Sequence, residues 1–82
     1  MSMIVGVHEG PLGSEFADKF YVAAEGVLGP FARRQTQYLY ADGTWHLSCR
    51  DRDGVFRGYF PTREKAAETL RCTSFSPVWL EP

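Results

Sequence analysis

Few side chains in this sequence could carry out catalysis, and their spacing does not bring them together. The chain has two histidines, His8 and His46, and two cysteines, Cys49 and Cys72. A nucleophilic site needs a cysteine or serine beside a histidine base, but His46 and Cys49 would point to opposite faces of a regular strand. A structural zinc site needs four ligands, and the sequence has no Cys-x-x-Cys pair. We therefore expect no catalytic residue, no metal and no cofactor.

Acid–base catalysis by paired carboxylates is not expected either. The candidate acids Asp42, Asp51 and Asp53 fall in predicted turns. Exposed carboxylates there would keep ordinary pKa values, which suit general acid–base catalysis at neutral pH poorly. The glycines near the N-terminus match no nucleotide-binding fingerprint. The side chains therefore predict a binding protein and not an enzyme.

Length and composition predict one small domain over residues 1–82. A core of this size is expected to supply roughly 3–5 kcal/mol of stability. No apolar run is long enough to span a membrane, and the start of the chain does not have the pattern of a signal peptide. We therefore expect a cytoplasmic protein without membrane contact. Both thiols would then be reduced and partly buried, with a disulfide as the alternative.

The net charge of −1 is unevenly distributed along the chain. Residues 1–30 carry four acidic side chains and one lysine, whereas residues 31–71 carry eight basic and five acidic side chains. Arginine outnumbers lysine seven to two, and its planar guanidinium suits phosphate and carboxylate recognition. This distribution fits either a solvated surface of mixed charge or a basic patch that touches nucleic acid.

Apolar patterning predicts an α+β fold. Residues 3–7 form a predicted strand. Residues 14–28 are predicted as a helix, because Ser14 could cap it, apolar side chains recur three and four apart, and Gly29-Pro30 would end it. Residues 20–22 also have the composition of a strand, which leaves that alternative open.

The second half of the chain predicts an antiparallel meander followed by a helix. Strands are expected over 35–40, 44–50 and 55–60, joined by Asp-Gly turns at 42–43 and 53–54. Thr62 would cap a helix over 62–71 that packs on one face of this three- to four-stranded sheet. Residues 75–80 would add an edge strand or a strap.

Alternation along the strands predicts which side chains stay open to a partner. Trp45, Leu47 and Cys49 share one face, which the helix would cover. The other face mixes arginines, hydroxyls, amides, a histidine and a tyrosine, and it contains no acid. Such a face could bind phosphates, base edges or an acidic protein patch. The candidate partner-binding residues are Gln37, His46, Ser48, Arg50, Arg57 and Tyr59, with Gln35 beside them.

Residues 38–71 resemble the N-terminal arm-type DNA-binding domain of phage tyrosine integrases. The resemblance rests on Asp42-Gly43-Thr44-Trp45, on the segment from Arg50 to Gly54, and on Phe60-Pro61-Thr62-Arg63-Glu64-Lys65-Ala66. It implies a three-stranded sheet that packs on a helix and enters the DNA major groove, and an origin in a phage or mobile element. The implied DNA contacts are His46, Ser48, Arg50 and Arg57.

Two functions follow as expectations. The first is a phage or mobile-element protein that inhibits or adapts a larger host protein or nucleoprotein assembly by direct binding, as an anti-CRISPR does. The second is duplex DNA binding through the open sheet face. The net charge of −1 favours the first. An exposed edge strand could also pair in a homodimer, and Trp79 could serve as core or as a docking anchor.

Overall fold

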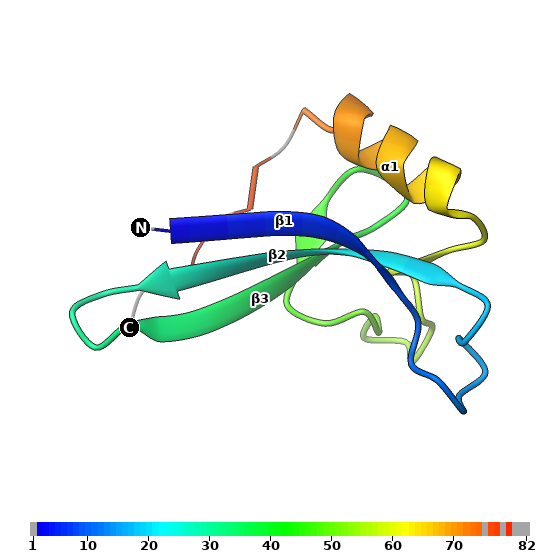
Figure 1. The fold of residues 1–82 in the computed structure, drawn as a ribbon, viewed down its shortest axis with the longest axis horizontal. Helices are drawn as coiled ribbons and strands as arrows, with labels where there is room; N and C mark the ends of the chain where they lie inside the picture. Colours follow the sequence, from blue (N-terminus) through cyan, green and yellow to red (C-terminus); the bar gives the residue numbers. More distant parts are fainter. Residues whose placement is uncertain (1, 75, 78, 80–82) are drawn as a thin grey trace.

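The computed structural model describes residues 2–74, 76, 77 and 79. These residues form a five-stranded antiparallel sheet with one helix on one face (Figure 1). The elements are β1 (Ser2–Glu9), β2 (Phe20–Leu28), β3 (Arg33–Leu39), β4 (Trp45–His46), β5 (Tyr59–Phe60) and α1 (Arg63–Cys72). The predicted class, α+β with an antiparallel sheet and one packed helix, is confirmed.

The central strand of the sheet is β2. On one side β1 pairs with it from Phe20 to Val27. On its other side β5 pairs at Phe20 and Tyr21, and β3 pairs over residues 23–28. The short strand β4 then extends the sheet beyond β3 through the pairs Tyr38–His46 and Leu39–Trp45.

The predicted N-terminal helix over 14–28 is wrong, because most of that segment is β2. Val22, Ala23 and Ala24 are buried in succession, so both faces of the strand are covered. A strand that is covered on both faces loses the alternation that would distinguish it from a helix. Ser14 does not cap a helix; its hydroxyl donates to the carbonyl of Pro11 and accepts from the backbone N–H of Phe16 in a turn.

The predicted meander is only partly present. β4 is two residues long, and β5 pairs with β2 instead of β4. Between β4 and β5, the described residues form one isolated antiparallel bridge, which joins Arg50 and Phe56. The carbonyl of Cys49 accepts from the N–H groups of both Arg57 and Gly58 at 3.0 and 3.1 Å. Two residues opposite one form a β-bulge, which bends this segment away from the sheet.

Both predicted Asp-Gly turns are present, and they share one geometry. Tyr40 and Thr44 close the first turn and Asp51 and Val55 close the second, each by an N–H···O bond of 2.8 Å. The final loop residue is a glycine with φ of +85° in both. This is the three-residue hairpin loop in which glycine takes the left-handed conformation at a bulge.

The main core lies between the sheet and α1. Its buried side chains are Val22, Leu39, Phe60 and Ala66. The helix begins as predicted, since the Thr62 hydroxyl accepts from the Lys65 N–H at 3.1 Å. The predicted first strand is confirmed as β1.

One residue of the C-terminal segment, Trp79, also returns to the sheet. The half-buried Trp79 lies against Gly26 of β2, where an added Cβ would come within 3.0 Å of the indole. This contact shows that Trp79 packs against the chain's own sheet. Residues 75, 78 and 80 of the predicted strap lie outside the described residues.

Candidate functional site

A broad depression of about 620 Å³ lies where β3, β4 and the segment 47–52 meet. We call it the β4 groove. Its lining includes Gln37, Tyr40, Trp45, His46, Leu47, Ser48, Arg50 and Arg52. Four of the six predicted partner-binding residues therefore border one hollow. A smaller depression of about 250 Å³ lies between the turn at 41–43 and the C-terminal end of α1.

Tyr40 fixes the shape of the β4 groove. This tyrosine is buried, and its hydroxyl donates to the carbonyl of Ser48 at 2.7 Å. Its ring stacks on the imidazole of His46 with centroids 3.8 Å apart. Burial is the main cause that raises the pKa of Tyr40 above its usual value, followed by the negative charge of Asp51. The neutral hydroxyl is therefore retained as a donor, and it holds the groove segment to β3.

His46 is held at its other side by the turn. Its Nε2 lies 2.8 Å from the hydroxyl of Thr44, which itself lies 2.5 Å from a carboxylate oxygen of Asp42. A hydroxyl has one proton, and the carboxylate accepts it, so Nε2–H of His46 donates to Thr44. The bonds from Thr44 lower the pKa of Asp42 below its usual value. The imidazole is thus oriented as part of the groove wall.

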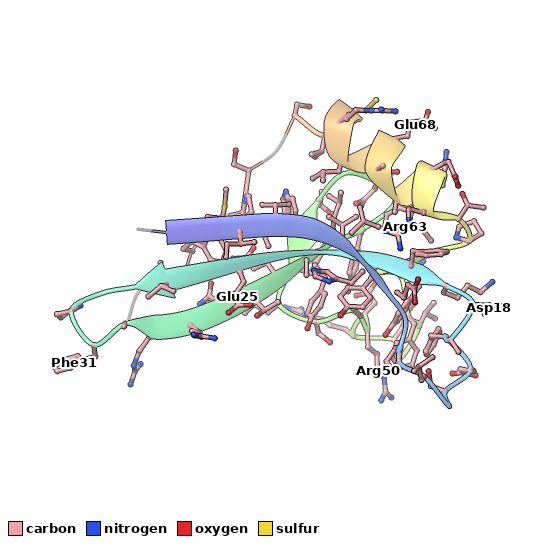
Figure 2. All side chains as sticks on the ribbon, viewed as in Figure 1. Asp18, Glu25, Phe31, Arg50, Arg63 and Glu68 are labelled. Atoms are coloured by element: carbon pink, nitrogen blue, oxygen red, sulfur yellow. The ribbon has the colours of Figure 1, made fainter. Side chains whose placement is uncertain are left out.

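Two arginines supply the positive charge of the site. Arg50 and Arg52 are both exposed, and no carboxylate of the described residues pairs with either guanidinium. Arg50 lies over the ring of Phe56, 5.8 Å from its centroid, and it projects from the side of the sheet away from α1 (Figure 2). The acid between them, Asp51, is already bound to Arg57. Both arginines are therefore open to an anionic partner.

Arg57 does not line the groove. Its guanidinium binds Asp51 at 2.8 Å and Asp53 at 2.9 Å. These bonds raise the pKa of Arg57, with the hydrogen bond to Asp53 as the largest cause. The two carboxylates offset its charge, so a phosphate would have to compete with them for the same donors.

Tyr59 belongs to a cluster of aromatic rings on the sheet face away from α1. The ring of Phe16, from the loop between β1 and β2, stacks on Tyr59 with centroids 4.1 Å apart and planes within 5°. Tyr21 meets Tyr59 edge-on at 6.0 Å, and His8 stacks on Tyr21 at 5.2 Å. This face was predicted to be open and polar. The loop folds under it instead, and the rings form a second packed layer.

Gln37 also differs from its prediction. It is buried, with 4% of its surface exposed, and its amide donates to the side chain of Gln35 at 3.1 Å. Alternation along β3 places Gln35 and Gln37 on the same face as the core residue Leu39. They do not join the open face with Tyr38. Gln37 reaches the groove only at the edge of the sheet.

Cys49 has the wrong surroundings for a nucleophile. It is half-buried near Tyr59, and burial raises the pKa of its thiol to about 11. It forms no disulfide with Cys72, which is exposed. Among the described residues no three histidine, cysteine or acidic side chains are grouped to hold a metal ion.

Three residues of the groove were not among the predicted partner-binding side chains. Trp45 was predicted to face the core, and it packs against the core cluster while it also borders the groove. Leu47 was likewise predicted to face the core but has 53% of its surface exposed, and Arg52 was predicted only as a turn residue. The regular strand ends at His46, so alternation no longer applies from Leu47 onward. The charged sequence around Gly54 belongs to the second predicted turn, so it gave no signal that the strand stops at His46.

Comparisons with known proteins identify no relative that bears on this site. No helix in the part of the chain that the structure describes has the length and apolar character needed to cross a membrane. Neither a protein-family model, nor a curated protein, nor a solved structure matches the chain.

Proposed function

We propose that the chain is a non-enzymatic protein-binding module, and that the β4 groove binds an acidic segment of its partner that also carries an apolar side chain. The observation that carries this proposal is the pairing of two unneutralised guanidinium groups, on Arg50 and Arg52, with the apolar wall of Trp45 and Leu47. Tryptophan and arginine are the residue types most enriched at the centre of protein interfaces.

The apolar wall supplies the affinity in this proposal. Leu47 is half exposed, so a partner side chain that covers it would gain about 1 kcal/mol. Trp45 is half-buried and packs against the core cluster, so little conformational entropy is lost when a partner packs against it. The contacts from Tyr40 to His46 and Ser48 keep the groove preformed.

The two arginines supply orientation and speed of association. Both are exposed, so each would contribute modestly to affinity, and the contribution would fall with ionic strength. An acidic segment is favoured over a neutral one because no carboxylate of the described residues neutralises them. A carboxylate group can also accept two parallel N–H bonds from one guanidinium.

Duplex DNA fits this surface less well. Arg57, one of four contacts implied by the integrase resemblance, is bound to Asp51 and Asp53. The strand β4 is only two residues long, so the regular three-stranded sheet that would enter a major groove is not formed. The origin in a phage and the host assembly as target stay predictions.

Selection of displayed random peptides tests the proposal. Peptides that bind the wild-type chain should be enriched in acidic residues beside a large apolar residue. Binding should fall about 10-fold or more in the double variant Arg50→Glu, Arg52→Glu. The matched control, Arg33→Glu with Arg71→Glu, makes the same change of charge outside the groove and should bind as the wild type does.

The same proteins decide between a protein partner and DNA. Fluorescence anisotropy with a labelled duplex is measured at low and at physiological salt. We expect no binding at physiological salt. Tight binding to the duplex that weakens steeply with salt and disappears in the groove variant would replace the protein-binding proposal with DNA binding. Selected peptides that lack acidic residues, or that bind both double variants equally, would also contradict the proposal.

A further inference from the structure

The two edges of the sheet differ in how well they are protected against pairing with a further strand. One edge is formed by the short strands β4 and β5, each two residues long, and by β3, which starts with Arg33 and Arg34. The other edge is β1, which is eight residues long and pairs with β2 over its whole length. No described strand pairs with the outer side of β1 (Figure 1).

Over residues 2–7, the outer edge of β1 has none of the usual sequence features that prevent strand pairing. Residues 2–7 contain no charged residue and no proline, and β1 pairs with β2 residue for residue without a bulge. Edge strands of natural proteins normally carry charged residues, prolines or bulges, which hinder pairing with another strand. Two apolar side chains are also exposed there, Ile4 with 76% and Met3 with 48% of their surfaces accessible. An edge of this kind can pair with a further strand.

We propose that β1 pairs with β1 of a second copy of this chain, antiparallel about a two-fold axis through Val5. The strand is complementary to itself in this register. Ile4 lies opposite the partner's Gly6, beside the imidazole of the partner's His8, which lies 3.6 Å from where a Cβ on Gly6 would be. The same contact occurs twice by symmetry. Met3 lies opposite the partner's Val7 on the face that carries α1.

Other registers are less favourable. A shift that centres the axis on Ile4 pairs residues 2–6 of the described strand. A shift that centres it on Gly6 places Met3 opposite the partner's Glu9, a charged carboxylate. With the axis at Val5, residues 2–8 all pair, and both Glu9 side chains lie outside the paired stretch. Each Glu9 also keeps its contact with Arg63 at the start of α1, 3.5 Å away.

The helices do not obstruct this arrangement. The start of α1 lies beside Glu9, at the C-terminal end of β1. Antiparallel pairing about Val5 puts the two copies of Glu9, and therefore the starts of the two helices, at opposite ends of the paired strands. Both helices lie on the same face of a continuous sheet, because directly opposite residues of antiparallel strands point to the same side.

Sedimentation velocity from micromolar to millimolar concentration tests the proposal. The wild type should shift from monomer to dimer within this range, because a strand-edge interface is small. Ile4→Lys should weaken the dimer about 100-fold, with about a tenfold loss from each of two symmetric contacts. The control Leu12→Lys removes an apolar side chain that is 90% exposed elsewhere and should dimerise as the wild type does.

Crosslinking tests the register. In a background of Cys49→Ala and Cys72→Ser, an added Val5→Cys should form an intermolecular disulfide on mild oxidation, since residues on the axis have Cα atoms roughly 4.5–5.5 Å apart. Ile4→Cys should not. Circular dichroism checks that every variant folds.

Three results would overturn the proposal. A wild type that stays monomeric at millimolar concentration would show that no second copy binds this edge. A dimer that is unaffected by Ile4→Lys would have another interface. Crosslinking of Ile4→Cys in preference to Val5→Cys would show that the axis does not pass through Val5.

Discussion

The hydroxyl of Tyr40 is the most direct test of how the β4 groove is held. It donates to the carbonyl of Ser48 at 2.7 Å and joins β3 to a segment that has left the sheet. Tyr40→Phe removes this bond and keeps the ring that stacks on His46 at 3.8 Å. The change therefore isolates one hydrogen bond from the packing around it.

The expected cost is about 1 kcal/mol of unfolding free energy, the net value of one intramolecular hydrogen bond. It should not be much larger, because Ser48 is exposed and water can bond to its freed carbonyl. For a chain of 82 residues this corresponds to a fall in Tm of about 4–8 °C. The amides of residues 47–52 should also exchange with solvent faster, because local opening no longer breaks the bond.

Urea unfolding followed by tryptophan fluorescence measures the change, and hydrogen exchange locates it. Tyr21→Phe is the matched control. Tyr21 is half-buried and makes ring contacts with Tyr38 and Tyr59, but its hydroxyl has no hydrogen-bond partner among the described residues. This control should change stability by less than about 0.5 kcal/mol.

Equal effects of the two substitutions would refute the reasoning. The bond from Tyr40 would then contribute no more than a solvated hydroxyl. A loss of stability without faster exchange over residues 47–52 would also contradict it, since the bond would then support the core and not the groove.

Three further perturbations test other parts of the fold. Phe16→Ala removes the ring stacked on Tyr59 and should cost about 1–3 kcal/mol in urea unfolding; unchanged stability would mean that the second aromatic layer does not support the sheet. Thr62→Ala removes the helix cap and should cost about 1 kcal/mol, whereas Thr62→Ser should retain most of it. Because the pKa of the Cys49 thiol rises from 9.0 in the unfolded chain to about 11, its contribution to stability is complete below pH 9.0 and is lost as the pH rises toward 11. Unfolding measured against pH should show a smaller alkaline fall in Cys49→Ala, and an identical fall in both proteins would contradict this assignment.

Local signals were sufficient to predict α1 and β1. Four local features predict the helix: Pro61 before it, the N-cap at Thr62, an acidic residue in the first turn, and Arg71 in the last turn. These residues interact within one or two helical turns, so their contributions to helix stability can be read from the local sequence. The two Asp-Gly turns were predictable for the same reason, because each loop closes on itself.

The strand β2 could not be separated from a helix by local reasoning. Its side chains satisfy the spacing of an amphipathic helix, and only Gly26 and the strand composition of residues 20–22 argued against one. What decides the structure is pairing on both edges, with β1 on one side and β3 and β5 on the other. Those partners come from distant parts of the chain, so their contribution is invisible in a short window.

The groove depends on β4 ending at His46, and the bulge at Cys49 follows in the same segment. Alternation predicted a regular strand through Arg50, which would have buried Leu47 beside Trp45. Gly58 can approach Cys49 closely, since an added Cβ would lie 3.1 Å from the Cys49 Cα. This close approach lets one carbonyl accept two N–H groups and turns the segment outward. The sequence shows a glycine at position 58, but it does not show which backbone segment that glycine contacts.

The two proposed contact surfaces lie at opposite ends of the strand order, with the β4 groove beyond β3 and the pairing edge on β1. Pairing through β1 would therefore leave both grooves open at the two outer ends of one continuous sheet. A partner that repeats its acidic segment could engage both at once and gain avidity without any new contact. Ile4→Lys would remove only this gain, whereas Arg50→Glu with Arg52→Glu would remove binding at each groove. The two proposals can thus fail independently, because each is tested by residues that the other does not use.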